Sequence, residues 1–329
     1  TYTVQGYFYA SNDCANTFNV ASLMHNADTL KDSVCVQVQP TCYTPNMIYL
    51  PDQTELINIG STFNNDTFYV AGVLLIENMT ATFNNCVIYT AAGANIIINT
   101  AQVYLNSSYI IACDTMWQGI TMLDDAWIYT DTTHIEDAHI AIDFVGNGGG
   151  FKIQDSYMIN NVTSINVPPS ASCNTHNIYG YVAGTKFGLY KTKFPKDYIG
   201  QLAHGIKPFT GISMVDMIFT LGDNTAAKNT FHNMNSGFVA FQSDIKIYNS
   251  TCDKVAEDNF YLHTWRGTAM VSLSGFCGLP GKMVVHPNLI DTLVFNSFRG
   301  SYADNSNFTL TGNKLWKVNT GVYATNCKG

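Results

Sequence analysis

Short runs of alternating apolar and polar residues recur along the chain, and each run contains one small polar pivot. Four segments share this shape, which is a short alternating strand, the pivot and a second short apolar strand. Alternation with a period of two predicts β-strands. The pivots follow one another after 22, 25 and 24 residues, and they are Asn84, Asn106, Asp131 and Asp155.

A repeat of this length, built of short strands, predicts a parallel β-helix. Leucine-rich repeats have a similar period but need regular leucine columns, which this chain lacks, and WD40 blades need about 40 residues. In a parallel β-helix each strand pairs with its equivalent one coil away, about 4.8 Å along the axis. We expect inward Ile, Val, Leu and Phe to stack in columns, and corner Asn and Thr to form hydrogen-bonded ladders.

The repeat does not cover the whole chain evenly. Residues 1–55 show little alternation and hold three cysteines, so we predict an N-terminal cap that covers the open end of the β-helix. The predicted β-helix then spans 56–329. Prolines and glycines interrupt its rhythm, and we predict irregular insertions near 168–215 and 256–290.

Composition excludes several classes of protein. Charged residues make up only 12% of the chain, and 16 basic against 24 acidic residues give a net charge of −8. A nucleic-acid-binding protein would show a cationic footprint, so no nucleic-acid partner is expected. Apolar and aromatic residues are too plentiful for a disordered chain. No apolar run reaches about 18 residues, so no membrane-spanning helix is expected.

The cysteines indicate an oxidising compartment. All nine are isolated, with no CxxC pair, which favours disulfides and a secreted, extracellular or cell-surface protein. Three of them are close enough in sequence to staple the predicted cap. Buried free thiols are the alternative for any one cysteine. The disulfide candidates are Cys14, Cys35, Cys42, Cys173, Cys252, Cys277 and Cys327.

Six N-x-S/T sequons are candidate glycosylation sites, although several would arise by chance in a chain this rich in Asn, Ser and Thr. They are Asn65, Asn78, Asn106, Asn161, Asn249 and Asn307.

One stretch of the chain resembles a known group of proteins. Three coil motifs follow one another, AAGANIII at 91–98, CDTMWQGIT at 113–121 and IEDAHIAI at 135–142. They are similar to consecutive coils of secreted Bacteroidota surface proteins associated with type IX secretion, over roughly 65–165. The resemblance implies a right-handed, pectin-lyase-like parallel β-helix and an exported surface protein, and it implies no named activity. Within these motifs we expect Trp117 to be a core residue.

Candidate catalytic residues are few. Asp124, Asp125, His204 and Lys246 superficially resemble the acids, His-Gly and basic motif of pectinolytic β-helix hydrolases, but their spacing departs from one coil per motif. Polysaccharide lyases need a basic group near calcium ligands, and only two arginines exist here. The negative net charge would also repel polyuronates.

Calcium is the one candidate cofactor. Asp131 and Asp155 are expected in one column, with Asp137 and Asp143 nearby, and stacked carboxylates repel unless a cation compensates them. Ordinary corner turns are the competing interpretation.

These observations predict a non-enzymatic, extracellular structural or adhesive protein, a subunit or module of a cell-surface filament or adhesin that associates with itself or with other chains. Aromatic residues are frequent, among them Tyr69, Tyr104, Tyr109 and Tyr129. An exposed row of tyrosines or tryptophans would either bind sugars or pack between subunits. The alternative is a carbohydrate-active or carbohydrate-binding β-helix, resembling a polysaccharide hydrolase or lyase, with a glycan ligand.

Overall fold

The computed structural model describes residues 42, 44–168, 178–190, 210–215, 217–223, 228–241 and 244–253, and outside these ranges it describes strands alone. The chain divides into two compact units, Thr1–Tyr43 and Thr44–Gly329. Each unit is treated separately below.

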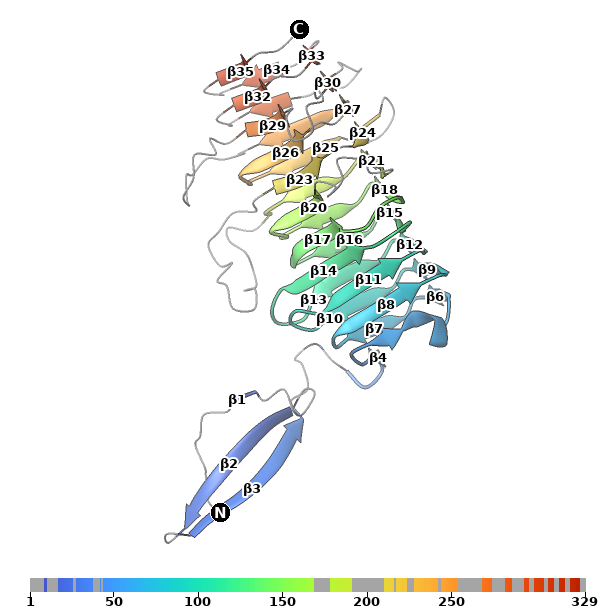
Figure 1. Ribbon diagram of the computed structural model, residues 1–329, viewed down its shortest axis with the longest axis vertical. Helices are drawn as coiled ribbons and strands as arrows, with labels where there is room; N and C mark the ends of the chain where they lie inside the picture. Colours follow the sequence, from blue (N-terminus) through green and yellow to red (C-terminus); the bar gives the residue numbers. More distant parts are fainter. Residues whose placement is uncertain are drawn as a thin grey trace. The chain divides into compact units, whose positions relative to one another are not determined.

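The first unit contains an antiparallel sheet with the order β1 (Tyr9–Ala10), β2 (Thr17–His25) and β3 (Asp28–Gln37) (Figure 1). The second unit begins its parallel strands at β4 (Ile48–Leu50), which lies inside the segment predicted as a cap. A single 3₁₀ turn, η1 (Leu56–Asn58), follows, and the described residues contain no α-helix.

The second unit is a parallel β-helix, as the repeat predicts. Its described strands form three parallel sheets, here named S1, S2 and S3, and each coil contributes one strand to each sheet in turn (Figure 1). S1 has eleven strands: β4, β7 (Thr67–Val70), β10 (Val87–Thr90), β13 (Tyr109–Ala112), β16 (His134–Glu136), β19 (Tyr157–Ile159), β22 (Lys186–Gly188), β25 (Asn229–His232), β28 (Ser250–Asp253), β31 (Leu293–Phe295) and β34 (Lys314–Trp316).

S2 also has eleven strands: β5 (Thr54–Glu55), β8 (Val73–Glu77), β11 (Asn95–Asn99), β14 (Trp117–Met122), β17 (Ala138–Phe144), β20 (Thr163–Val167), β23 (Thr210–Val215), β26 (Ser236–Phe241), β29 (Thr268–Leu273), β32 (Arg299–Asp304) and β35 (Thr320–Thr325). S3 has ten: β6 (Thr62–Asn64), β9 (Thr80–Asn84), β12 (Gln102–Asn106), β15 (Trp127–Asp131), β18 (Gly150–Gln154), β21 (Tyr179–Ala183), β24 (Ile218–Leu221), β27 (Asp244–Ile247), β30 (Lys282–Val285) and β33 (Asn307–Leu310).

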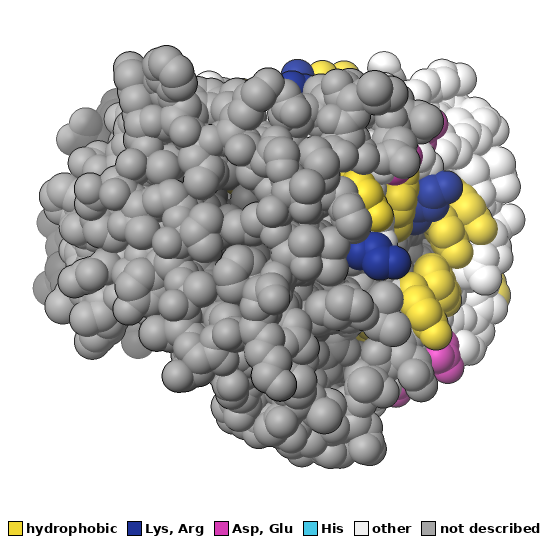
Figure 2. Space-filling view, turned by 90° about the horizontal axis from the view of Figure 1, so that it is seen from above, with side chains coloured by type: hydrophobic (Ala, Val, Ile, Leu, Met, Phe, Trp, Pro, Cys, Tyr) yellow, Lys and Arg dark blue, Asp and Glu magenta, His cyan; other side chains and the backbone are white. Residues whose placement is uncertain are grey.

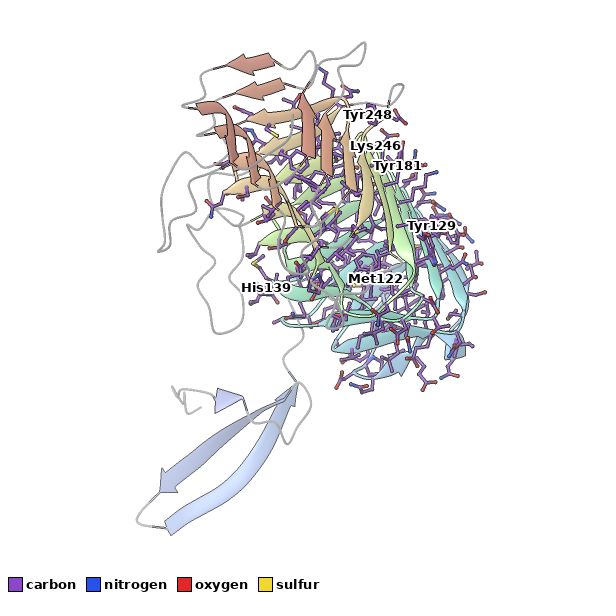
Figure 3. All side chains as sticks on the ribbon, turned by 45° about the horizontal axis from the view of Figure 1, so that its top comes forward. Met122, Tyr129, His139, Tyr181, Lys246 and Tyr248 are labelled. Atoms are coloured by element: carbon purple, nitrogen blue, oxygen red, sulfur yellow. The ribbon has the colours of Figure 1, made fainter. Side chains whose placement is uncertain are left out.

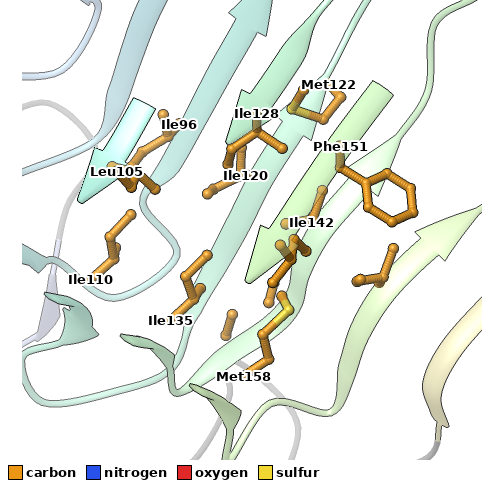
Figure 4. Close-up of a cluster of buried hydrophobic side chains, with 14 of the residues drawn as sticks. Ile96, Leu105, Ile110, Ile120, Met122, Ile128, Ile135, Ile142, Phe151 and Met158 are labelled. Atoms are coloured by element: carbon orange, nitrogen blue, oxygen red, sulfur yellow. The ribbon is translucent and has the colours of Figure 1, made fainter. Parts of the chain in front are cut away.

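The core is a stack of inward side chains from all three sheets. Alternation along each strand sends every second residue inward, and equivalent residues of successive coils pair in register, as in Ile96, Ile120 and Ile142 of S2. Figure 4 shows these residues packed against inward residues of S1 and S3. Burying such side chains contributes about 25 cal/mol per Å² of apolar surface, which stabilises the stack of coils.

The corner between S3 and S1 uses the same two positions in successive coils. The first position adopts a positive φ at Asn65, Asn85, Ser107, Thr132 and Asp155. Asn and Asp tolerate this left-handed conformation better than most residues. This positive φ turns the chain sharply, so that the next S1 strand begins directly after the second corner residue.

The second corner position carries a buried ladder of small polar side chains. Ser108 Oγ accepts a hydrogen bond from the Cys86 backbone N–H and donates one to the Phe83 carbonyl oxygen. Thr133 repeats both bonds in the following coil, accepting from the Ser108 backbone N–H and donating to the Leu105 carbonyl oxygen. Ser156 accepts from the Thr133 backbone N–H and donates to the Gln154 carbonyl oxygen. Because each hydroxyl satisfies backbone groups of neighbouring coils, the ladder avoids the cost of buried unpaired polar groups.

An asparagine ladder confirms the predicted pivots, with one correction. Asn84 Nδ2 donates to Asn64 Oδ1 at 2.9 Å, and Asn106 Nδ2 donates to Asn84 Oδ1 at 2.8 Å. Asp131 pairs with Asn106 in register, but its partner in the next coil is Gln154. Asp155 occupies the left-handed corner position, with φ 46°, so its predicted place in the pivot column is wrong by one residue.

The predicted insertions are interrupted by strands of the repeat. Within 168–215 the chain forms β21, β22 and β23, and within 256–290 it forms β29 and β30. Within those two segments, the described residues leave out 169–177, 191–209, 256–267, 274–281 and 286–290.

The structure corrects the cysteine predictions. Cys42 is disulfide-bonded as expected, and Cys113, which was not a candidate, is also disulfide-bonded. Cys252 is a buried free thiol, so the prediction of a disulfide there is wrong. It pairs in register with Phe231, an inward residue of S1, and fills the core as a small apolar side chain. The side chain of Cys35 lies outside the described residues, and so do Cys14, Cys173, Cys277 and Cys327.

Trp117 is a core residue, as predicted. Its side chain is fully buried, and its indole Nε1 donates to the Glu136 carbonyl oxygen at 2.9 Å. The ring therefore packs in the apolar core while its indole N–H keeps a hydrogen-bond partner.

Candidate functional site

The outer face of S3 carries a row of tyrosines and lysines. Outward residues in register, from β12 to β27, include two lysines and three tyrosines, and they form what we call the tyrosine–lysine column: Tyr104, Tyr129, Lys152, Tyr181 and Lys246. Thr220 occupies the remaining position, between Tyr181 and Lys246. Figure 3 shows the labelled Tyr129, Tyr181 and Lys246 along one side of the β-helix, with His139 on another side.

The rings of this face stack along the direction in which the coils repeat. The Tyr104 and Tyr129 centroids are 4.5 Å apart and their planes differ by 7°. Because this separation is close to the spacing between coils, the ring faces cover each other and the ring edges point outward. Aromatic edges carry partial positive charge, whereas aromatic faces carry partial negative charge.

A second outward column beside the first extends the aromatic surface. Trp127 lies 5.9 Å from Tyr129 and 6.4 Å from Tyr179, with nearly parallel rings in both pairs. Gly150 separates Trp127 from Tyr179 in the register, and a Cβ there would lie 2.9 Å from Trp127 Cζ3. The glycine thus allows Trp127 to reach across one coil. Tyr179 remains 56% exposed.

Burial raises the pKa of two phenol groups on this face, those of Tyr129 and Tyr181. The neighbouring Tyr104 adds to the rise in the pKa of Tyr129. The hydroxyl of Tyr181 donates to Asp223 Oδ2 at 2.6 Å. Tyr104 donates to Gln102 Oε1 at 3.1 Å.

Two lysines give the tyrosine–lysine column positive charge, and no carboxylate belongs to the column. Lys152 lies 5.9 Å from the centroid of the Tyr181 ring, and both Lys152 and Lys246 are exposed. Among the described residues of the tyrosine–lysine column there is no acidic side chain. In the described part seen from above, Figure 2 shows Lys or Arg side chains beside hydrophobic ones, with Asp or Glu side chains nearby.

The outer face of S1 has similar rings and carries histidine–carboxylate pairs. His134 is stacked between Tyr109 and Tyr157, at 4.4 and 4.2 Å, and its Nδ1 lies 2.9 Å from Glu136 Oε1. Lys186 lies 4.7 Å from the centroid of the Tyr157 ring.

A second histidine pair lies further along S1. His232 Nδ1 is 3.0 Å from Asp253 Oδ2, and the Tyr190 ring lies 5.2 Å from the His232 ring. Each of these two carboxylates on S1 therefore has a histidine partner in direct contact.

The candidate catalytic residues are not assembled into one site. Asp124 and Asp125 are exposed at the corner before β15, where Asp124 Oδ1 accepts a hydrogen bond from the Asn147 backbone N–H. Lys246 lies in β27, four coils further along S3 and so about 19 Å away along the axis. His204 lies outside the described residues.

The candidate calcium ligands are also separated. Asp137 is buried at a corner with φ 59°, whereas Asp143 faces outward from S2 and accepts a hydrogen bond from Asn166 Nδ2 at 2.8 Å. Burial raises the pKa of Asp143. Asp131 and Asp155 occupy different columns. In the described part of the chain, no group of three or more His, Cys, Asp or Glu side chains could hold a metal ion.

The structure sorts the sequons by exposure. Asn65 and Asn78 are exposed at left-handed corner positions, and Asn106 belongs to the asparagine ladder. Asn161 and Asn249 are buried, and Asn161 bonds to the backbones of Ala138 and Ile135. This burial excludes these two as glycosylation sites of the folded chain. The side chain of Asn307 is not described.

Sequence reasoning missed several residues of the S3 face. Tyr104 and Tyr129 were singled out, but Lys152 and Tyr181 were not, because single residues in different coils show no local motif. The repeat itself holds the missing signal, since aligning the coils by their corner residues brings these positions into one column.

Comparison with known proteins adds no relationship. No family model, no curated protein and no solved structure matches the chain. None of the helices in the described part is both long and apolar enough to cross a membrane. The geometry of the outer faces therefore carries the functional argument.

Proposed function

We propose that this chain is an extracellular structural and adhesive module of a cell surface, part of an adhesin or of a surface filament. The observation that carries the proposal is the tyrosine–lysine column, an outward-facing row of half-buried tyrosines and exposed lysines on successive coils of one sheet. A β-helix presents such a row along its length, which suits contact with an extended partner.

The interior supports the same proposal. Inward positions are filled by apolar side chains, and the S3–S1 corners are tied by buried hydroxyl ladders. Close packing and satisfied polar groups make a rigid support for surface residues. The disulfide-bonded Cys42 and Cys113 are consistent with an oxidising, extracellular environment.

Adhesion can be tested with coated beads. Beads carrying the purified chain should resist washing from a surface coated with extracellular polysaccharide, in comparison with beads carrying serum albumin. Equal release of the two kinds of bead would contradict the adhesive function. Electron microscopy of the same preparation separates filament from adhesin, because a filament subunit forms fibres and an adhesin module remains as single particles.

A carbohydrate-active β-helix is the second candidate function, and the edge-on tyrosines beside Lys152 favour it, since hydroxyl and ammonium groups bind sugars. Incubation with neutral and acidic polysaccharides tests it directly. Release of reducing ends or unsaturated products would establish an enzyme, and intact polymer that stays bound would support the adhesive module.

A further inference from the structure

We propose that the tyrosine–lysine column of S3 binds an acidic glycan, a polysaccharide bearing carboxylate or sulfate groups, laid along the axis of the β-helix. The inference rests on the proposed adhesive function and names its ligand class. It places the ligand on S3 and not on S1.

The charge of the column is the first argument. Lys152 and Lys246 are exposed on one face, three coils apart, which is about 14 Å along the axis. No described residue of the column is acidic. The chain as a whole is acidic, with a net charge of −8, but exposed charges are screened beyond about 8 Å at physiological ionic strength. A ligand at this face therefore responds mainly to the two lysines and to groups near them.

Acidic residues lie beside the column, at its edges and in the neighbouring positions. Asp131 ends β15, two residues after Tyr129, and Asp244 begins β27, two residues before Lys246. Burial, Asp223 and Asp155 all raise the pKa of Tyr181, and Asp223 accepts the hydrogen bond from its hydroxyl. A carboxylate engaged by a phenol donor repels a nearby anion less than an unpaired one, because part of its charge is already compensated.

The orientation of the rings is the second argument. The stacked Tyr104 and Tyr129 rings direct their edges outward, and these edges carry partial positive charge. The hydroxyl of Tyr129 can donate a hydrogen bond to sugar oxygens, because a phenol is protonated at neutral pH. Ring edges, phenol donors and ammonium groups together form a surface that attracts anionic, hydroxyl-rich ligands.

The outer face of S1 provides the contrast. It has a lysine of similar setting, Lys186, stacked on Tyr157 as Lys152 is placed over Tyr181. From β13 to β28, however, the S1 column holds one lysine, Lys186, whereas the S3 column holds two. Lys186 is therefore a matched control, since it is a single exposed lysine against a tyrosine ring on a face with similar stacking.

Binding of three oligosaccharide classes tests the inference. The probes are oligogalacturonate, which carries carboxylates and no sulfate, carrageenan oligosaccharides, which carry sulfates and no carboxylate, and neutral cello-oligosaccharides, each titrated calorimetrically into the intact chain. We expect an acidic probe to bind, with affinity that falls as salt is raised. Comparing the carboxylated and sulfated probes identifies which anionic group the face prefers.

Variants then locate the site. The double substitution Lys152→Gln and Lys246→Gln should weaken binding of the acidic probe about tenfold, whereas Lys186→Gln should leave it within about twofold. Circular dichroism checks that each variant keeps the β-helix. Equal loss in both variants, or no loss in the double variant, would overturn the assignment to S3.

The neutral probe separates a failure of the acidic-glycan inference from a failure of the proposed adhesive function. If cello-oligosaccharides bind as tightly as the acidic probes, the acidic-glycan inference fails while the adhesive function stands. If no probe binds and coated beads also wash off freely, both fail.

Discussion

The outer faces of S3 and S1 use the same architecture and differ in their charges. Both present aromatic side chains stacked from coil to coil, and both place a lysine over a tyrosine ring. On S1 the two carboxylates Glu136 and Asp253 each have a histidine partner. From β12 to β27 the S3 column holds two lysines, whereas the S1 column from β13 to β28 holds one. Stacking is therefore common to both faces, and the pair of lysines in one column distinguishes the face proposed to bind a ligand.

We expect the largest loss in free energy of unfolding when a glycine of either face is replaced by alanine. Gly188 of S1 has a φ of 119°, and a Cβ there would lie 1.9 Å from the His232 carbonyl oxygen. Gly188→Ala should therefore lower the free energy of unfolding by about 3 kcal/mol or more, through backbone strain and overlap. Denaturant unfolding measures it, and an unchanged midpoint would contradict the described packing of β22 on β25.

Gly150→Ala on S3 is the matched substitution. Its added Cβ would lie 2.3 Å from the Tyr179 carbonyl oxygen and 2.9 Å from Trp127 Cζ3, but the backbone is not in the left-handed region. We expect a smaller loss of about 2 kcal/mol, together with a change in Trp127 fluorescence. A loss larger than that of Gly188→Ala would reverse the proposed ranking.

Removing one ring from each stack should give the next largest effect. Tyr157 of S1 stacks on His134 and also supports Lys186, whereas Tyr104 of S3 stacks on Tyr129 alone in its column. Tyr157→Ala should cost about 2 kcal/mol and Tyr104→Ala about 1 kcal/mol. Thermal unfolding of both variants checks the order, and equal losses would show that the additional contacts of Tyr157 contribute nothing.

A hydrogen bond within S3 gives the smallest predicted effect. Tyr181→Phe keeps the ring under Lys152 and removes the donor to Asp223. The expected loss is about 1 kcal/mol, because the bond is charge-assisted but partly exposed to water. Tyr104→Phe, which removes a neutral bond to Gln102, serves as the comparison and should cost less. If the two variants lose the same free energy of unfolding, the hydrogen bond to Asp223 contributes no more than a neutral one.

The fold was largely predictable from the sequence, because each coil of a β-helix repeats the same pattern of apolar and polar positions along the chain. The pivots Asn84 and Asn106 mark the ends of successive S3 strands, and the registers of β9, β12 and β15 follow from them. The predicted pivot was wrong by one residue at Asp155, because an Asp suits both the pivot position and the left-handed corner position beside it. The residues around Asp155 do not show which of the two positions it occupies.

The candidate site was less predictable, for a physical reason. Lys152 and Tyr181 lie almost thirty positions apart in the sequence, and only the register of β18 on β21 brings them into contact. The free thiol of Cys252 shows the same limit. Its inward position depends on the pairing of β25 with β28, and the composition of the chain pointed instead to a disulfide.

The claim that S3 is the ligand face is tested most directly by lysine footprinting. The intact chain is acetylated briefly with and without a saturating acidic oligosaccharide, and the modification of each lysine is measured by mass spectrometry. The account predicts that the glycan protects Lys152 and Lys246 and leaves Lys186 as reactive as before. Protection of Lys186 with Lys152 and Lys246 unchanged would contradict it.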